Sequence, residues 1–193
     1  SSELWPQLRF QIVPQCHLSA ALAVGFTFRR NTGADLDLVE VHRGEHWLAA
    51  ATPAQPDPSI WDVSTSVVEG GSDVAAVFSV SQDISESVRA YITASGISVG
   101  HVIYFSPVAG HSLDSVGGAL GPGHAAVLAS TAAGRLRDVQ NGHARGVLHL
   151  FLAGPPAFAV ILAQQLSNAG LIQTYEWVDG ASTYTASIQL RSS

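Results

Sequence analysis

The sequence predicts an α/β protein with mainly parallel sheets. Segments typical of strands and of helices alternate along the 193 residues. Two segments, residues 74–80 and 147–152, are almost continuously apolar, as strands covered on both faces are. Glycine and proline mark most of the junctions between segments. Because parallel neighbours need crossover helices, this alternation favours a parallel sheet in each half of the chain.

The first elements form a strand, a helix and a hairpin. Residues 8–13 are expected as a strand, and residues 18–30 as a helix whose apolar positions recur every three or four residues. Residues 37–42 and 46–51 alternate apolar and polar side chains around an Arg-Gly turn, which predicts a β-hairpin. The proline-rich stretch of residues 52–71 is expected as a loop.

The middle of the chain continues the alternation. The apolar strand 74–80 precedes a helix at 84–95, with polar capping residues between them. Residues 101–105 are expected as the next strand. A glycine-rich connection at 106–123 then leads to a helix at about 124–141, and this connection is interpreted as the seam between two halves.

The last part of the chain repeats the strand and helix order. After the strand 147–152, two prolines start a helix that runs through residue 168, since proline is tolerated in the first turn. Residues 171–178 and 184–190 are expected as the final strands, joined by a short turn.

Composition excludes several classes of protein. Only 12% of residues are charged, against about 25% in ordinary domains. The net charge is −6 and the nine basic residues are all arginine, so no basic stripe exists for a long nucleic acid. The paired donors of arginine still suit a few contacts to a small anionic ligand.

The cysteine and methionine counts carry further expectations. Cys16 is the single cysteine, so an internal disulfide and a cysteine zinc site are excluded, and a reducing cytoplasmic location is expected. No segment is expected to span or bind a membrane. The chain contains no methionine and is therefore expected to be part of a longer polypeptide.

Two motifs suggest catalysis or a cofactor, and both are rejected. Residues 42–46 spell H-x-x-E-H, but the pattern straddles a predicted hairpin instead of one helix face, so no metal site is expected. Residues 121–126 spell G-x-G-x-x-A without the preceding strand that a dinucleotide fingerprint requires. Asp35 and Asp37 point to one face of the expected strand and Glu40 points to the other, and paired-carboxylate chemistry is not expected there. No catalytic residue is assigned.

Ligands of parallel α/β sheets gather beyond the carboxyl ends of strands. Four predicted loops occupy such positions: 14–17, 79–83, 106–112 and 153–156. These loops are the places where a binding site is expected.

Residues 149–180, HLFLAGPPAFAVILAQQLSNAGLIQTYEWVDG, resemble the core of the SAVED domain. The matching features are a His-x-Phe strand start, a turn of small residues and proline, a helix of small apolar residues and a Tyr-Glu strand. The residues that fit are His149, Phe151, Ala153, Pro155, Tyr175 and Glu176. Residues 20–50 and 74–92 also resemble the upstream part of that family.

The resemblance implies two fused CARF-like Rossmann-type subdomains, with pseudo-halves at about residues 1–120 and 121–193. It implies a sensor that binds a cyclic di- or trinucleotide in CBASS antiphage defence, needs no cofactor and catalyses nothing itself. In the parent protein a fused N-terminal effector, expected to be a nuclease, would be activated by ligand-driven homo-oligomerisation.

We assign candidate ligand-binding roles to residues near the expected loops. Phosphate contacts are assigned to Arg29, Arg30 and Thr32, to the helix that begins at Pro155 and Pro156, and to the amides of Ala157 and Phe158. Base edges are assigned to Ser81, Gln82 and Asp83, and base stacking to Phe105, Tyr175 and Trp177. The remaining candidates are Gln15, His17, Ser106, Pro107, Ala153 and Gly154.

Structural alternatives stay open for each group. The arginines could complement the carboxyl end of a helix, residues 81–83 could cap the next helix, and the aromatic residues could be core. Two other functions also stay open: a Rossmann-type enzyme with a nucleotide cofactor, and an assembly scaffold without a ligand.

Overall fold

A computed structural model describes residues 9–29, 32, 34–40, 45–48, 59, 61–108, 122–143, 146–166 and 168–191. The elements in these ranges are, in chain order, β1 (Arg9–Ile12), α1 (Leu18–Thr27), β2 (Asp35–Glu40), β3 (Glu45–Leu48), β4 (Trp61–Val67), β5 (Asp73–Ser79), α2 (Ser85–Ser95), β6 (Val99–Pro107), α3 (Pro122–His143), β7 (Leu148–Ala153), α4 (Pro156–Gln165), β8 (Leu171–Val178), the 3-10 turn η3 (Asp179–Ala181) and β9 (Thr183–Arg191).

The strands form two sheets, which confirms the predicted α/β class. The smaller sheet has the order β1-β2-β3, with β1 and β2 parallel and β3 antiparallel. The larger sheet has the order β4-β6-β5-β7-β8-β9. Its four inner strands are parallel, and the edge strands β4 and β9 are antiparallel to their neighbours.

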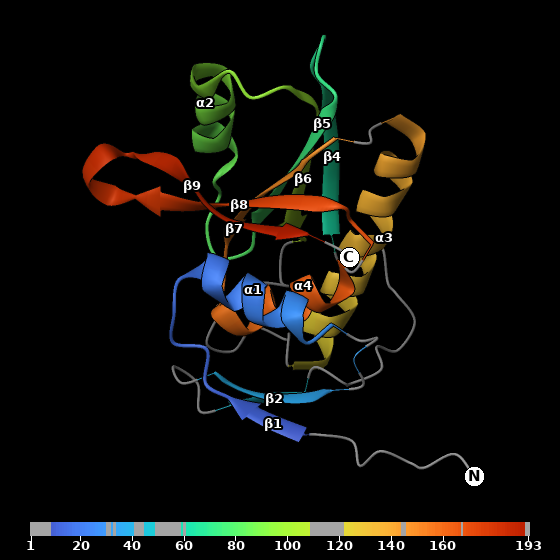
Figure 1. Ribbon diagram of the computed structural model, residues 1–193, viewed down its shortest axis with the longest axis vertical. Coiled ribbons are helices and arrows are strands. Elements are labelled where there is room, and N and C mark those ends of the chain that lie inside the picture. Colours follow the sequence, from blue (N-terminus) through green and yellow to red (C-terminus); the bar gives the residue numbers. More distant parts are fainter. Residues whose placement is uncertain are drawn as a thin grey trace.

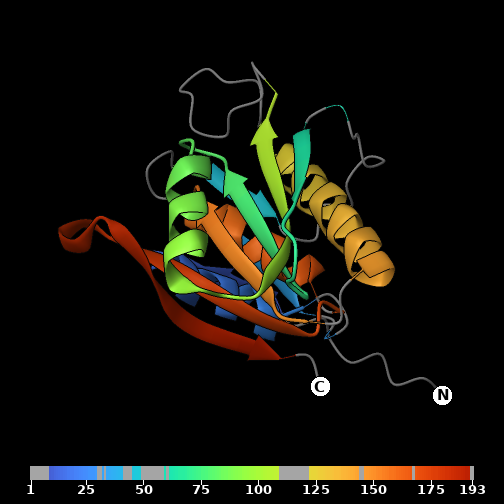
Figure 2. The ribbon, with the colours of Figure 1, turned by 90° about the horizontal axis from the view of Figure 1, so that it is seen from above.

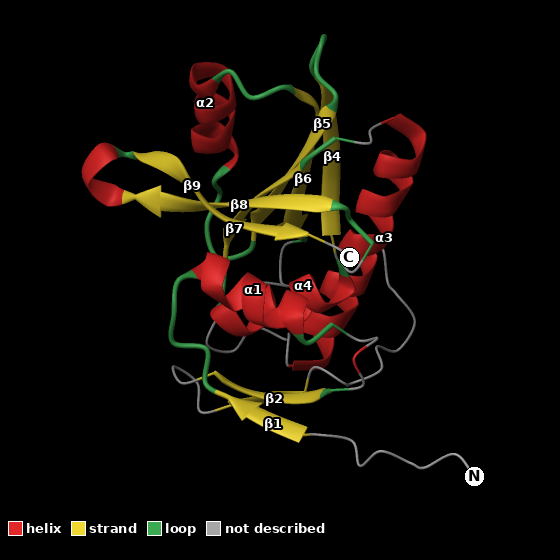
Figure 3. Ribbon diagram, viewed as in Figure 1, coloured by secondary structure: helices red, strands yellow, loops and turns green. Residues whose placement is uncertain are grey.

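The helices lie on defined faces of these sheets. Helices α1 and α4 form a layer between the smaller and the larger sheet (Figures 1 and 3). Helix α3 packs beside α4, whereas α2 lies on the opposite face of the larger sheet (Figure 2). The nearly all-apolar sequence of β7 follows from this arrangement, because both of its faces are covered.

Two hydrophobic clusters fill the layers. The larger cluster joins the smaller sheet, α1, α3, α4 and one face of the larger sheet. Within it the rings of Phe78 and Phe105 stack at 4.6 Å between centroids, and Trp61 packs edge-on against both. The indole N–H of Trp61 donates to the Leu128 carbonyl at 2.9 Å, which satisfies its polar atom. The smaller cluster lies under α2.

Helices α1 and α4 pack against each other in parallel. A Cβ atom at Gly25 would overlap the Val160 backbone, so this position requires glycine. Further along, the Gln164 side chain donates to the Phe28 carbonyl at 2.8 Å. Gly25 lies against Val160, and one turn further along both helices Phe28 lies against Gln164. The two helices therefore run in the same direction, and their amino ends lie side by side.

Several predicted boundaries need correction. Residues 61–67, expected in a loop, form strand β4, which pairs antiparallel with β6. Helix α1 ends at Thr27, not at residue 30, and α4 ends at Gln165, not at residue 168. The Arg-Gly turn of the predicted hairpin lies outside the described residues, although the two strands around it do pair.

The predicted seam near residue 120 does not separate the sheets. Strand β5 pairs with β6 on one side and with β7 on the other, so strands from both sides of the glycine-rich connection share one sheet. The sheets divide between β3 and β4 instead.

Candidate ligand-binding edge

The carboxyl ends of the parallel strands meet at one edge of the larger sheet, which we call the carboxyl edge. It comprises the loop after β5 (residues 80–84), the end of β6, the turn after β7 (residues 154–155) and the end of β8. The backbone amides of Val80 and Ser81 both donate to the Ala153 carbonyl, at 2.9 and 3.0 Å. This pairing holds the loop after β5 against the turn after β7.

The smaller sheet contributes to the same edge through the loop after β1. The backbone N–H of Ser19, in the first turn of α1, donates to Oε1 of Glu176 on β8 at 2.6 Å. Burial and the nearby charge of Glu176 raise the pKa of the Cys16 thiol. Residues 13–17 therefore lie beside the end of β8, although they are separated from it by more than 150 positions in the sequence.

Two helix amino termini face this edge. Neither the N-cap residue of α1, His17, nor that of α4, Pro155, makes a side-chain capping hydrogen bond, and neither first turn contains an acidic residue. Free amides at a helix start attract anions. Two such starts packed in parallel concentrate positive partial charge at the carboxyl edge.

A pocket of about 280 Å³ lies near the β6 end of the carboxyl edge, next to the first turn of α2. Its lining residues are polar: Asp62, Ser64, Thr65, Ser66, Ser85, Arg89, Tyr104 and Ser106. The Arg89 guanidinium lies 5.9 Å from the centre of the Tyr104 ring. The volume is slightly below the ~300–1,000 Å³ of pockets that enclose drug-sized ligands, so it suits one part of a larger ligand.

Most of the sequence-predicted residues are brought together at the carboxyl edge. These are Gln15, His17, Ser81, Gln82, Asp83, Ser106, Pro107, Ala153, Gly154, Pro155, Pro156 and Trp177. The amides of Ala157 and Phe158 belong to the first turn of α4, as expected, and their side chains are buried.

Two aromatic residues of the predicted set lie in the core, which corrects their assignment as stacking platforms. Phe105 is 0% exposed and its ring is stacked on Phe78. Tyr175 is buried, and its ring stacks on Phe151 at 4.3 Å between centroids. A ring packed in this way presents no free face to a base, so we remove both residues from the site.

Trp177 differs from these two residues. It is 43% exposed, and its indole touches Tyr184 edge-on at 5.1 Å. The strand alternation expected from the sequence is present: Trp177 and Tyr175 lie on the α2 side of β8, and Glu176 lies on the α1 side. Of the predicted aromatic residues, Trp177 therefore keeps an accessible ring at the carboxyl edge.

The predicted phosphate-binding arginines do not reach this edge. Arg29 follows the carboxyl end of α1, and its guanidinium lies 5.0 Å from the centre of the Phe26 ring. Thr32 donates its hydroxyl to the Arg29 carbonyl at 2.7 Å. The ten residues of α1 separate them from the carboxyl edge by about 15 Å of helix rise. Arg30 lies outside the described residues.

Asp83 caps a helix, which is the structural alternative that the sequence left open for residues 81–83. Its Oδ1 accepts the Ser85 backbone N–H at 2.9 Å, so it caps the start of α2. This hydrogen bond is the main reason why the pKa of Asp83 is lowered. Ser81 and Gln82 are exposed.

Sequence reasoning missed Glu176, Ser19 and Arg89 at this edge. Glu176 belongs to the Tyr-Glu motif, but the motif alone assigns it no role. Arg89 could have been found, because it follows one turn after the start of the helix next to the 81–83 loop. The contact between Ser19 and Glu176 gave no signal in the sequence, since it joins residues 157 positions apart.

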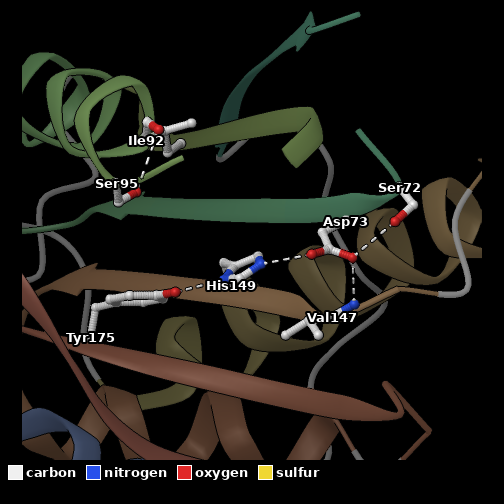
Figure 4. Close-up of polar contacts among 7 residues, drawn as sticks. All are labelled: Ser72, Asp73, Ile92, Ser95, Val147, His149 and Tyr175. Atoms are coloured by element: carbon white, nitrogen blue, oxygen red, sulfur yellow. Dashed lines mark hydrogen bonds and ion pairs between the residues drawn. The ribbon is translucent and has the colours of Figure 1, made fainter. Parts of the chain in front are cut away.

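A buried polar network begins at the opposite edge of the sheet, and we call it the amino-edge network (Figure 4). The Tyr175 hydroxyl lies 2.7 Å from His149 Nδ1, and His149 Nε2 lies 3.2 Å from Asp73 Oδ2. Oδ1 of Asp73 accepts the Val147 backbone N–H at 3.0 Å. Because a carboxylate only accepts, His149 donates a hydrogen bond from Nε2. The Nδ1 atom of a neutral imidazole then accepts a hydrogen bond from the Tyr175 hydroxyl.

The described residues carry no group of three or more His, Cys, Asp and Glu side chains placed to hold a metal ion. Most of the H-x-x-E-H motif lies outside these residues, and its His46 contacts Asp37 at 3.0 Å across the hairpin. In the part of the chain that the structure describes, no helix is long and apolar enough to span a membrane.

This fold defines the class of protein: two Rossmann-like α/β units are joined through parallel helices, and their strand ends converge at one edge. In such sheets that edge is where ligands bind. The chain belongs to the SAVED family, described as the "SMODS-associated and fused to various effectors sensor domain", whose model matches residues 6–190.

Individual relatives agree with this membership. The chain is 28% identical over 161 residues to CD-NTase-associated protein 4 of Enterobacter hormaechei subsp. hoffmannii (strain UCI 50), covering 83% of this chain and 31% of that protein. It is similar in fold to the SAVED/CARF-domain containing receptor Cap4 of Acinetobacter baumannii, solved with the cyclic trinucleotide 2'3'3'-cAAA. There the TM-score is 0.77 and the identity 18%, over 95% of this chain and 39% of that one.

Two further receptor structures are similar. The A. baumannii receptor solved with 3'3'3'-cAAA gives a TM-score of 0.74 at 19% identity, over 95% of this chain and 39% of that one. The receptor of Moraxella osloensis gives 0.63 at 18% identity, over 95% and 37%. The chain thus spans about a third of the length of these relatives.

Proposed function

We propose that this chain is a sensor domain that binds a cyclic di- or trinucleotide at the carboxyl edge. One observation carries the proposal: two helix amino termini whose N-cap residues make no side-chain hydrogen bond, those of α1 and α4, lie side by side where the strand ends of both sheets converge. Membership of the SAVED family and the cyclic trinucleotides in two similar receptors support the choice of ligand.

The edge offers a part for each chemical group of such a ligand. Backbone amides at the starts of α1 and α4 suit the phosphates. The exposed ring of Trp177 suits stacking of a base, and Ser81 and Gln82 offer hydrogen-bonding groups to base edges. The polar pocket beside Arg89 adds a cation at the β6 end of the carboxyl edge.

The finer steps of the proposal concern the parent protein in the cytoplasm. There, ligand binding promotes homo-oligomerisation and activates a fused effector, a nuclease, in antiphage defence. The length of the relatives supports a further domain in the parent protein, since this chain spans only about a third of them. A ligand can drive such assembly only by binding the assembled state more tightly.

Thermal unfolding against a panel of cyclic di-, tri- and tetranucleotides tests the binding step, with NAD, ATP and linear oligonucleotides as controls. At a hundred times the dissociation constant, a ligand stabilises the fold by about 2.7 kcal/mol, which raises Tm by roughly 5–10 °C for a domain of this size. A shift with one cyclic species supports the sensor. A shift with NAD alone supports a cofactor-binding enzyme, and a folded protein that no compound stabilises supports a scaffold.

Light scattering of the same chain with and without the best ligand tests the assembly step. We expect the mean mass to rise on addition of ligand. An unchanged mass at saturating ligand would restrict this domain to binding and would move assembly to another part of the parent protein.

A further inference from the structure

The anion at the start of α1 comes from a distant strand. The Ser19 backbone N–H donates to Oε1 of Glu176 at 2.6 Å, a short distance typical of a charge-assisted bond. The first turn of α1 contains no acidic residue, and the N-cap His17 contributes no side-chain hydrogen bond. A carboxylate of β8 therefore occupies the place where the proposed site would take a phosphate.

A second observation at the same place indicates unused binding capacity. Ser19 is 1% exposed, and its hydroxyl oxygen has no hydrogen-bond partner. Ser19 belongs to the first turn of α1 and its own N–H contacts Glu176, so this hydroxyl lies at the carboxyl edge. Buried hydroxyls are nearly always paired, and an unpaired one therefore suggests a missing partner.

The neighbouring helix, α4, also offers backbone amides at its start to an anion. Helix α4 begins beside α1, and its N-cap residue Pro155 makes no side-chain capping bond. The first backbone amides of α4 follow Pro156, and its first turn contains no acidic residue that could accept hydrogen bonds from them. The carboxylate of Glu176 thus fills one of two adjacent anion positions.

We infer that Glu176 is an internal stand-in for a ligand phosphate and is displaced from α1 when the ligand binds. This inference rests on the proposed function and assigns the regulation of the same site. The phosphate would accept the Ser19 N–H and the Ser19 hydroxyl together, which one carboxylate oxygen does not do here. Since two anions repel each other at this distance, the phosphate and the Glu176 carboxylate exclude one another.

Displacement of Glu176 has a structural consequence. Glu176 pairs with Thr185 near the turn of the β8–β9 hairpin, and this hairpin projects beyond the starts of α1 and α4 (Figure 1). The Ser19–Glu176 bond is one of several contacts that join α1 to β8 and β9, so its release loosens the packing of the hairpin against α1. The carboxylate sets the ligand concentration at which this release occurs.

Calorimetric titration of the whole chain tests the inference, with the cyclic nucleotide that binds the unaltered protein most tightly. We expect Glu176→Gln to tighten binding by about tenfold, the size of one lost charge-assisted competitor. Asp179→Asn, which removes an equal charge from the same hairpin, is the matched control and should change affinity less than twofold. Unchanged or weaker binding by Glu176→Gln would overturn the inference.

A phosphate titration gives a readout that does not depend on cyclic nucleotides. In thermal unfolding at constant ionic strength, inorganic phosphate should raise Tm of Glu176→Gln more than that of the unaltered protein, and Ser19→Ala added to Glu176→Gln should abolish the difference. Equal responses of all three proteins would overturn the inference. If phosphate discriminates among them but no cyclic nucleotide binds, the proposed function fails and the stand-in role remains.

Discussion

The two edges of the larger sheet treat polar groups in opposite ways. In the amino-edge network, Asp73, His149 and Tyr175 pair with one another, and Asp73 also accepts a backbone amide. At the carboxyl edge, two helix starts lack caps of their own and the Ser19 hydroxyl is unpaired. Ser19 is as buried as His149 and Tyr175, so exposure does not explain its unpaired hydroxyl. The comparison teaches that unmet hydrogen-bonding capacity, more than the presence of polar or titratable side chains, distinguishes the proposed binding edge from the amino edge of this sheet.

The largest effect is expected from breaking the amino-edge network at Asp73. Asp73→Ala leaves the Val147 amide and His149 Nε2 without their acceptor. Stranding these donors should lower the free energy of unfolding by about 3 kcal/mol and Tm by roughly 6–12 °C. Ligand affinity, measured where both proteins are folded, should stay the same. Glu86→Ala, an exposed change on α2, is the control for Tm, and a loss of affinity in Asp73→Ala would remove the contrast between the edges.

Removing the exposed ring at the carboxyl edge should have the reverse effect, a loss of ligand affinity with little loss of stability. Trp177→Ala should weaken binding by about 1–3 kcal/mol, the contribution of stacking on one base. Its effect on Tm should be small, since the indole is partly exposed and touches mainly Tyr184. Val178→Ala, the next exposed residue of the hairpin, serves as the control in the same titration. Equal affinities of all three proteins would exclude Trp177 from the site.

A milder change in the amino-edge network is Tyr175→Phe, which deletes the hydroxyl bound to His149. A stability loss of about 1 kcal/mol is expected by chemical denaturation. Burial also raises the pKa of the Tyr175 hydroxyl above its value in the unfolded chain. The unfolded chain therefore loses this proton first, and stability falls as pH rises above about 10. Tyr175→Phe should flatten that alkaline decline, and an unchanged slope would contradict this assignment.

The smallest effect is expected at Arg29, near the far end of α1. Because the guanidinium lies over Phe26 and away from the carboxyl edge, Arg29→Ala should change affinity by less than about 0.5 kcal/mol, the usual range for surface substitutions. Titration beside Trp177→Ala checks this directly. A larger loss for Arg29→Ala would place the ligand at the carboxyl ends of α1 and α4.

Local patterns in the sequence were sufficient for most of the fold. The apolar runs identified β5 and β7, and the strand that begins after Gly170 was correct to the residue. Strand β4 was missed because residues 62–67 are mostly small, polar and exposed, and only their pairing with β6 makes them a strand. The position of the seam failed for a similar reason, since the pairing of β5 with β7 is set by tertiary packing.

The parts of the candidate site that could be predicted are those whose position is determined by the direction of the parallel strands. Loops after parallel strands must share an edge, and this placed residues 81–83 and 153–156 correctly. The same rule would have excluded Arg29, because a helix that starts at this edge must end away from it. The sequence left open whether Phe105 is core, and its contacts with Trp61 and Phe78 decide this. The bond between Ser19 and Glu176 could not be foreseen, since it depends on how the two units pack.

The position of β5 at the centre of the larger sheet has a consequence for how the chain folds. Its partner β6 follows within about thirty residues, but β7 is synthesised only after α3, some seventy residues later. Until then one side of a largely apolar strand has unpaired backbone groups, which is the kind of edge that recruits other chains. Non-local pairing of this kind is slow to form. A nascent chain halted before residue 148 would therefore aggregate. The exposed side of β5 is protected only when β7 pairs with it.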